Sequence, residues 1–311
     1  MDNLTHSLVG AVLGRAGLKR LTGRAMPALI ISANLPDIDG WVAPLFGVPA
    51  LVAHRGFTHG IGGLVTLPFV TAAIILLWER LRPDIYQPVR FWPLVLVAFL
   101  GTLTHPILDY INTYGVRLLE PFSHRWFYGD AIFIVDPWIW LMMILGLEFS
   151  WRAERLGRDW QAPALTALSV LVGYLAINFA ITARAEAAAR PLVERVVRQP
   201  MIVAGEVPLT FWTRRIMWRG EGLSGSGDYD PLRGARLDPT ILPLHLDDPR
   251  LAAAEKRHPH VRAFVFFARM PMVIESGGRA YLTDQRFAGQ TRSVRTQSYF
   301  LIPLDSAPAA Q

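Results

Sequence analysis

The sequence has no cysteine and little charge. Of its 311 residues, none is cysteine, 18% are Asp, Glu, Lys or Arg, and 52% are hydrophobic. The lack of cysteine excludes disulfide bonds, thiolate-bound zinc and a cysteine nucleophile together. Any metal ion must therefore be held by histidine, carboxylate or backbone oxygen. The first residues also lack the basic segment of a cleavable signal peptide, so we expect them to remain in the mature protein.

The same composition indicates an integral membrane protein. The mean hydropathy is +0.29, too apolar for an ordinary soluble enzyme of this length. Residues 1–183 hold 13 basic and 12 acidic side chains, a net charge of +1, whereas residues 184–311 hold 18 and 13, a net charge of +5. The basic tail has no long Lys/Arg run, so we expect attraction to lipid headgroups and predict no nucleic-acid partner.

Four apolar segments are long enough to cross a bilayer, which needs about 20 residues of helix. They are residues 57–78, 91–111, 131–147 and 162–183, of which the third is short and contains Asp136 and Pro137. Two shorter apolar segments, residues 4–18 and 25–35, predict interfacial or re-entrant helices packed against the bundle.

The predicted fold is mainly α, a polytopic helical membrane bundle followed by a small, mostly β soluble domain. We place the membrane domain at residues 1–183, a helical linker at 184–200 and the basic β domain at 201–311. Residues 209–218, 261–268 and 297–302 are rich in β-branched and aromatic side chains, which favours strands.

His105 and Asp109 stand four residues apart within the second long segment. Positions i and i+4 of a helix share one face, so the imidazole and the carboxylate can meet at one point. Ionisable groups at membrane depth are costly and commonly mark functional sites. A simpler interpretation is a His–Asp hydrogen bond that joins two helices.

Other metal-ligand side chains precede the first long segment. Asp37 and Asp39 project from a turn that follows Pro36, and both carboxylates suit a divalent cation. His54, Arg55 and His59 lie within six residues at the membrane boundary, where arginine can also grip lipid phosphate. His6 opens the first short helix, where a lone histidine would ordinarily be structural.

Four spans would place the region before residue 57, the loop 112–130 and the tail on one side of the membrane. All the candidate residues then share that side. Basic residues occur on both sides, and their bias predicts a cytoplasmic site face. The site side would hold Arg15, Lys19, Arg20, Arg24, Arg55, Arg117, Arg125 and the arginines after Ala183, and the other side Arg80, Arg82, Arg90, Arg152, Arg155 and Arg158.

In their order along the chain, these motifs resemble the YdjM-type family of bacterial inner-membrane metal-dependent hydrolases. The resemblance covers about the first 150 residues and rests on four elements: Thr5-His6, Pro36-Asp37-Ile38-Asp39, His54 to His59, and Thr104 to Asp109. The His-x-x-x-Asp element is also distantly similar to zinc-dependent phospholipase C and related zinc nucleases. Those enzymes carry a second such pair, which this chain lacks, since His124 and Asp130 lie six residues apart.

The resemblance implies an enzyme of the inner membrane that hydrolyses a phosphoester or lipid-linked substrate by metal activation of water. The expected metal is zinc, with manganese or iron as alternatives, and the expected ligands are His6, Asp37, His59, His105 and Asp109. Arg55 would bind substrate phosphate. Asp39 and His54 would be catalytic: Asp39 as a bridging carboxylate, a base or a partner of a histidine, and His54 as an acid or a further ligand. Two other functions stay open, a metal-ion transporter and a membrane anchor or regulator.

Overall fold

The computed structural model describes residues 1–83, 87–288 and 300–304, which form two compact units. We call the first the membrane unit, made of residues 1–42, 53–180 and 206–211. The second, the C-terminal unit, is made of residues 43–52 and 181–205 and of the described residues from 212 onward.

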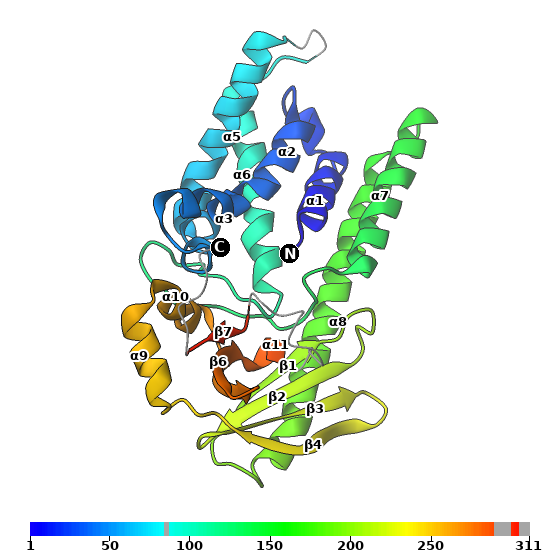
Figure 1. Ribbon diagram of the computed structural model, residues 1–311. Helices are drawn as coiled ribbons and strands as arrows, with labels where there is room; N and C mark the ends of the chain where they lie inside the picture. Colours follow the sequence, from blue (N-terminus) through cyan, green and yellow to red (C-terminus); the bar gives the residue numbers. More distant parts are fainter. Residues whose placement is uncertain (84–86, 289–299, 305–311) are drawn as a thin grey trace. The chain divides into compact units, whose positions relative to one another are not determined.

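The membrane unit is built from helices, which confirms the mainly α class (Figure 1). Most run along a common direction and pack side by side. They are α1 (Asn3–Arg15), α2 (Ala25–Asn34), α3 (Ile38–Val42), α5 (Ile61–Leu81), α6 (Phe91–Tyr110), α7 (Pro137–Arg155) and the first part of α8 (Gln161–Val193), with the 3₁₀ turns η1 (Leu18–Arg20), η2 (Leu35–Asp37) and η4 (Phe57–His59).

Helices α1 and α2 form an antiparallel pair whose turn reaches the connection between α5 and α6. Gly23 donates its backbone N–H to the carbonyl of Pro88, 3.1 Å away. Arg20 donates to Gln161 at the start of α8. We call this region, residues 16–24, 82–83, 87–90 and 156–160, the turn end. The opposite region, residues 35–42, 53–60 and 111–136, is the site end. The prediction that Arg15, Lys19, Arg20 and Arg24 share a side with the site is therefore wrong.

Three helices, α5, α6 and α8, are long and apolar enough to cross a membrane among the described residues. The fourth predicted span, residues 131–147, is not confirmed. Its helix, α7, begins only at Pro137, where Asp136 caps the helix by accepting from the N–H groups of Trp138 and Ile139. The helix also ends later than the predicted span, at Arg155. It therefore contains four charged residues: Glu148, Arg152, Glu154 and Arg155.

Glycine permits close packing of α1 and α6 against α2. A Cβ atom at Gly10 of α1 would lie 2.9 Å from the carbonyl oxygen of Leu29. One at Gly101 of α6 would lie 3.0 Å from the same oxygen and would also meet the hydroxyl of Ser32. Small residues are what allow helix backbones to approach within a membrane. Gly101 is one turn before His105, so this packing also sets the position of the site.

The C-terminal unit contains two sheets. The first has the strand order β1-β2-β3-β4, with β2–β3 and β3–β4 antiparallel, and the second has the order β5-β6-β7 with antiparallel pairs. The strands are β1 (Met201–Glu206), β2 (Arg214–Gly220), β3 (Leu223–Asp230), β4 (Gly234–Pro243), β5 (Pro271–Ser276), β6 (Arg279–Asp284) and β7 (Ile302–Pro303), and the helices are η3 (Ala43–Phe46), α4 (Ala50–Ala53), α9 (Pro249–Arg257), α10 (Pro259–Phe267) and α11 (Gln285–Ala288).

The predicted strands were only partly correct. Residues 209–218 contribute to β2, which begins at Arg214. The predicted strand at residues 261–268 is wrong, because residues 261–267 belong to helix α10. Pro259 occupies the first turn of that helix, and Val261, Phe264 and Phe267 recur at helical spacing and are buried. In the third segment, residues 297–299 lie outside the described residues, and β7 begins at Ile302.

We predict that Gly101→Val destabilises the protein, because the added side chain would collide with Leu29 and Ser32 in a close-packed helix interface. Overpacking of this kind costs about 1–3 kcal/mol. Thermal unfolding in detergent measures the loss. Gly173→Val in α8 is the matched control, since a Cβ atom there meets nothing within 4 Å. Equal melting temperatures for the two variants would contradict the packing argument.

Candidate metal centre

The centre forms where four separate chain segments meet at the site end. Asp2 caps α1 and places His6 in its second turn. Pro36 follows the end of α2 in η2, which positions Asp37. His59 ends η4, directly before α5, and α6 supplies the remaining two side chains, His105 and Asp109.

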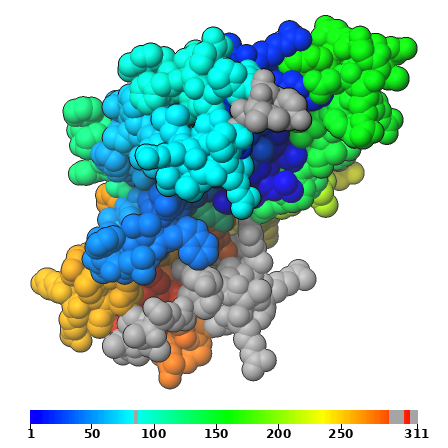
Figure 2. All heavy atoms as spheres, turned by 90° about the horizontal axis from the view of Figure 1, so that it is seen from above, coloured from blue at the N-terminus to red at the C-terminus, as the bar shows by residue number. Residues whose placement is uncertain are grey.

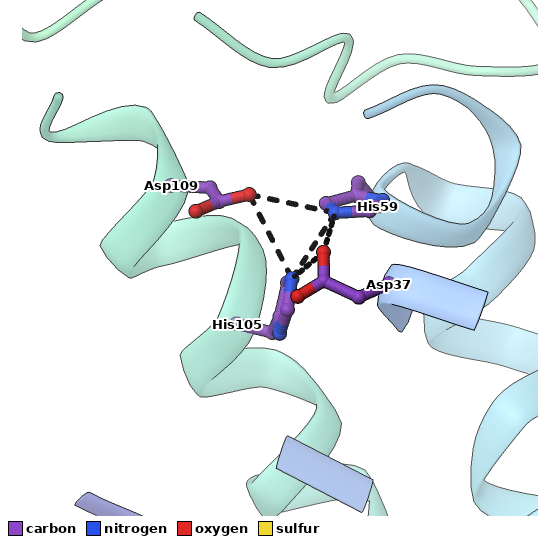
Figure 3. A group of neighbouring side chains, drawn as sticks. All are labelled: Asp37, His59, His105 and Asp109. Atoms are coloured by element: carbon purple, nitrogen blue, oxygen red, sulfur yellow. Dashed lines mark hydrogen bonds and ion pairs between the residues drawn. The ribbon is translucent and has the colours of Figure 1, made fainter. Parts of the chain in front are cut away.

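Two histidines and two carboxylates point toward one another in this centre (Figure 3). The Nε2 atoms of His59 and His105 are 3.1 Å apart. Each lies 3.3 Å from Oδ1 of Asp37, and Oδ2 of Asp109 lies 3.4 Å from the Nε2 atom of His59 and 3.7 Å from that of His105. One donor atom from each of the four residues lies within 4.8 Å of the others, so the group could hold a metal ion.

Neighbouring acceptors fix the tautomers of both histidines. His105 Nδ1 lies 2.6 Å from the carbonyl oxygen of Ala33, so Nδ1 carries the proton and donates it. His59 Nδ1 lies 3.0 Å from the hydroxyl of Thr58, which itself donates to Asp39. Both Nε2 atoms are therefore left with a lone pair directed at the centre. This is the arrangement in which metal-binding histidines are commonly held, with the second ring nitrogen donating to an acceptor.

The centre also contains buried polar atoms without hydrogen-bond partners among the described residues. They are both ring nitrogens of His6 and Oδ2 of Asp109. Oδ1 of Asp109 is occupied, because it pairs with Arg55 and with the α-amino group of Met1. His6 stacks on His105 with 3.8 Å between ring centroids, and its Nε2 atom lies 3.7 Å from Asp109. Because an unpaired buried polar group costs about 1–3 kcal/mol, these atoms fit a site that binds a cation.

The ionisation of the groups outside the spanning helices suits metal binding. Burial lowers the pKa of His6 well below its ordinary value, and the neighbouring His105 adds to this effect, so the His6 ring is neutral. Oδ1 of Asp37 lies 3.3 Å from both Nε2 atoms, so a bound cation would offset the repulsion between this carboxylate and the two lone pairs. A neutral imidazole beside an ionised carboxylate is the form that coordinates a cation.

Asp39 and His54 form a second group beside the first. His54 Nδ1 lies 2.8 Å from Oδ1 of Asp39, which leaves His54 Nε2 4.0 Å from Asp37. The His54 side chain is 37% exposed, whereas those of His59 and His105 are fully buried. Burial opposes ionisation of Asp39, but His54 and His59 hold its pKa far below the usual range. Asp39, His54 and His59 also meet the distance requirement for a metal site.

Arg55 is buried at the edge of the centre. Its guanidinium donates to the side chain of Asn112 at 3.0 Å, to the carbonyl of Gly115 at 3.1 Å and to Asp109 at 3.4 Å. Its φ of 61° lies in the left-handed region, which residues other than glycine adopt at a cost and which is common at functional sites. Substrate binding by Arg55 stays a prediction.

All eight residues singled out in the sequence lie in or beside this centre. Thr58 and the carbonyl of Ala33 were missed, although both fix histidine tautomers. Thr58 could have been noticed as the direct neighbour of His59, whereas a backbone carbonyl leaves no signal in a sequence.

Residues 1–185 match the family described as YdjM inner membrane protein, which covers more than half of the chain. The chain belongs to this family. The membership confirms the resemblance on which the metal-site residues were chosen and agrees with location in an inner membrane.

A relative of this YdjM-family chain is the uncharacterized protein YfhP of Bacillus subtilis (strain 168). The two are 25% identical over 240 residues, which are 72% of this chain and 69% of YfhP. No solved structure matches the chain. The family and the geometry together support a His/Asp cluster that could bind metal.

We predict that protein purified in detergent contains a divalent metal and that His105→Ala and Asp109→Ala each lose it, because each removes a donor from the centre. Inductively coupled plasma mass spectrometry measures the metal. His124→Ala is the control, since this histidine is also at the site end but is 72% exposed and lies outside the cluster. Gel filtration confirms that each variant is folded. Metal retained by folded His105→Ala protein would contradict the assignment.

We also predict that Asp39→Asn weakens metal binding without abolishing it. The substitution removes the charge that anchors Thr58 and His54, so His59 loses part of its orientation. Loss of such a supporting contact typically lowers metal affinity about 10–100-fold. Titration of the metal-free protein gives the affinity, and Asp159→Asn at the turn end is the control. An unchanged affinity would show that Asp39 does not support His59.

Proposed function

We propose that the protein is a membrane-embedded, metal-dependent hydrolase that acts on the phosphoester of a lipid or lipid-linked substrate. The observation that carries the proposal is the pair of histidine Nε2 lone pairs, held 3.1 Å apart between two carboxylates. This pair of nitrogen atoms fits a divalent cation better than a structural hydrogen bond, because two Nε2 atoms without protons cannot hydrogen-bond to each other.

The metal would be held by Asp37, His59, His105 and Asp109, with His6 as a fifth donor. A bound divalent cation lowers the pKa of a water molecule and neutralises charge on phosphoryl oxygens. Imidazole and carboxylate donors suit zinc, manganese or iron. Arg55 neutralises Asp109 from the opposite side and adds positive charge for the substrate phosphate.

Asp39 and His54 would transfer protons. Asp39 accepts from His54 Nδ1, which orients the ring and leaves Nε2 free to take up or release a proton. An imidazole oriented by a carboxylate is a common arrangement for general acid–base catalysis. His54 is also the most exposed histidine of the two groups, so we place the substrate on its side of the centre.

The position of the centre supports a lipid substrate. His105 is five residues before the end of α6, a distance of about 7.5 Å along the helix axis. Asp109 is one residue from that end. If α6 crosses the bilayer, the centre lies at the depth where lipid acyl chains meet their phosphate groups. The apolar side chains of Ile38 and Phe57, next to Asp37 and His59, are 44% and 49% exposed and suit contact with lipid.

Clustering of the donors at one end distinguishes this proposal from ion transport. A transporter requires polar groups near the middle of the membrane, where both sides can reach them in turn. Here Asp37, His59 and Asp109 each lie at or beyond the end of a helix. An anchor or regulator would retain its function without the metal, and it would not hydrolyse a phosphoester.

We predict that His54→Ala lowers phosphoester hydrolysis by roughly 10²–10⁴-fold and keeps the metal, because its role is proton transfer. The purified protein is assayed on a soluble aryl phosphodiester and on phospholipid in mixed micelles. Metal content is measured on the same samples, with His124→Ala as the control. If His54→Ala loses the metal, His54 is a ligand. If wild-type protein with metal bound hydrolyses neither substrate, the hydrolase proposal is wrong.

A further inference from the structure

Basic side chains are distributed unequally between the two ends of the membrane unit. Of the 13 lysines and arginines in residues 1–183, three lie at the site end: Arg55, Arg117 and Arg125. The other ten lie in or next to the turn end. They are Arg15, Lys19, Arg20, Arg24, Arg80, Arg82, Arg90, Arg152, Arg155 and Arg158.

The basic residues of the site end are mostly inside the protein. Arg55 is 4% exposed and pairs with Asp109, and Arg117 is 5% exposed and pairs with Glu120. Arg125 is exposed. Four more arginines, at positions 184, 190, 195 and 198, follow the apolar part of α8. They lie within about 15–20 residues of that part and are therefore counted with the site end, which then has seven basic residues against ten at the turn end.

Hydrogen bonds join the α1–α2 turn to the other two connections of the turn end, at one end of the unit (Figure 2). Arg15 and Lys19 pair there with Glu154, and Arg24 pairs with Glu79. In the view from above, the end of α5 and α6 is cyan, the α1–α2 turn dark blue and the end of α7 green. Several cations there are held over tryptophan rings: Lys19 over Trp160 at 4.0 Å, Arg24 over Trp78 at 4.6 Å and Arg155 over Trp151 at 3.6 Å. Tryptophan and arginine together are typical of the headgroup region of a membrane.

We infer that the turn end faces the cytoplasm, where its basic surface contacts the anionic headgroups of the inner leaflet, and that the metal centre opens on the opposite face of the membrane. Short cytoplasmic loops carry an excess of lysine and arginine, and an anionic leaflet attracts each such charge. The sequence predicted a cytoplasmic site face because Arg15, Lys19, Arg20 and Arg24 were assigned to the same side of the membrane as the site. Hydrogen bonds from this segment to Pro88 and Gln161 place it at the other end.

This orientation narrows the substrate class. If the centre is a hydrolase, which rests on the proposed function, its phosphoester is presented outside the cytoplasm, by the outer leaflet or the space beyond it. Cytosolic phosphoesters such as nucleotides are then excluded as substrates. The orientation itself does not depend on hydrolysis and is tested without an activity assay.

The absence of cysteine makes the test direct, because a single introduced thiol is the only one in the chain. Arg125→Cys marks the site end and Arg158→Cys marks the turn end. Both replaced side chains are exposed, and each variant removes one arginine, so the pair is matched. Sealed right-side-out and inside-out membrane vesicles from cells that express each full-length variant are treated with a charged, membrane-impermeant maleimide. Labelling after detergent gives the total reactive thiol.

We expect Arg125→Cys to be labelled in right-side-out vesicles and Arg158→Cys to be protected there, with the reverse in inside-out vesicles. The opposite pattern would overturn the inference and return the site to the cytoplasmic face. Labelling of both variants in both kinds of sealed vesicle would also overturn it, because it would show two orientations. The labelling pattern reports only the orientation of the protein, whereas metal content and hydrolysis are measured separately. A wrong orientation can therefore be distinguished from a wrong hydrolase proposal.

Discussion

The structure depends on the cost of keeping polar groups away from water. Helices satisfy their own backbone, but the side chains of His6, His59, His105 and Asp109 are buried at one end of an apolar bundle. Some of their polar atoms have hydrogen-bond partners. His105 bonds to the carbonyl of Ala33, His59 to the hydroxyl of Thr58, and Asp109 to Arg55. Oδ2 of Asp109 and the ring nitrogens of His6 remain without a hydrogen-bond partner among the described residues, and a cation would satisfy this carboxylate oxygen and one of the two nitrogens. Metal binding and stability of the bundle are thus linked, because a ligand that binds only the folded state stabilises it.

The short α1–α2 pair supplies the residues that complete the candidate metal centre. Its helices are too short to be counted as spans, yet they bring His6 and Asp37 to the same depth as the end of α6. Gly10 and Gly101 make this possible, because both allow close approach to Leu29. The site therefore rests on helix packing through small residues, and the ligands contributed by α6 gain their partners only when that packing forms.

Much of the site could be predicted from the sequence because its signals are local. The four-residue spacing of His105 and Asp109 fixes their shared helix face, and apolar length identifies α5, α6 and α8. Helix direction was harder to predict. Residues 4–18 and 25–35 fall below spanning length, so nothing in their composition shows that residues 16–24 reach the α5–α6 connection. The apolar run 261–268 combines the helical spacing of Val261, Phe264 and Phe267 with the β-branched and aromatic composition of a strand, and its helix is favoured by Pro259 and by packing in the C-terminal unit.

Asp39 connects His54 with His59, which is a predicted ligand of the metal centre. One of its oxygens accepts from His54 and the other from Thr58, which in turn accepts from His59. The carboxylate that orients His54 therefore also supports, through Thr58, the orientation of His59. Proton transfer and metal binding would not be independent in such a site, since the same carboxylate serves both. The two acidic residues of this short turn therefore have different contacts: Asp37 is directed at the centre, and Asp39 is directed at His54 and Thr58.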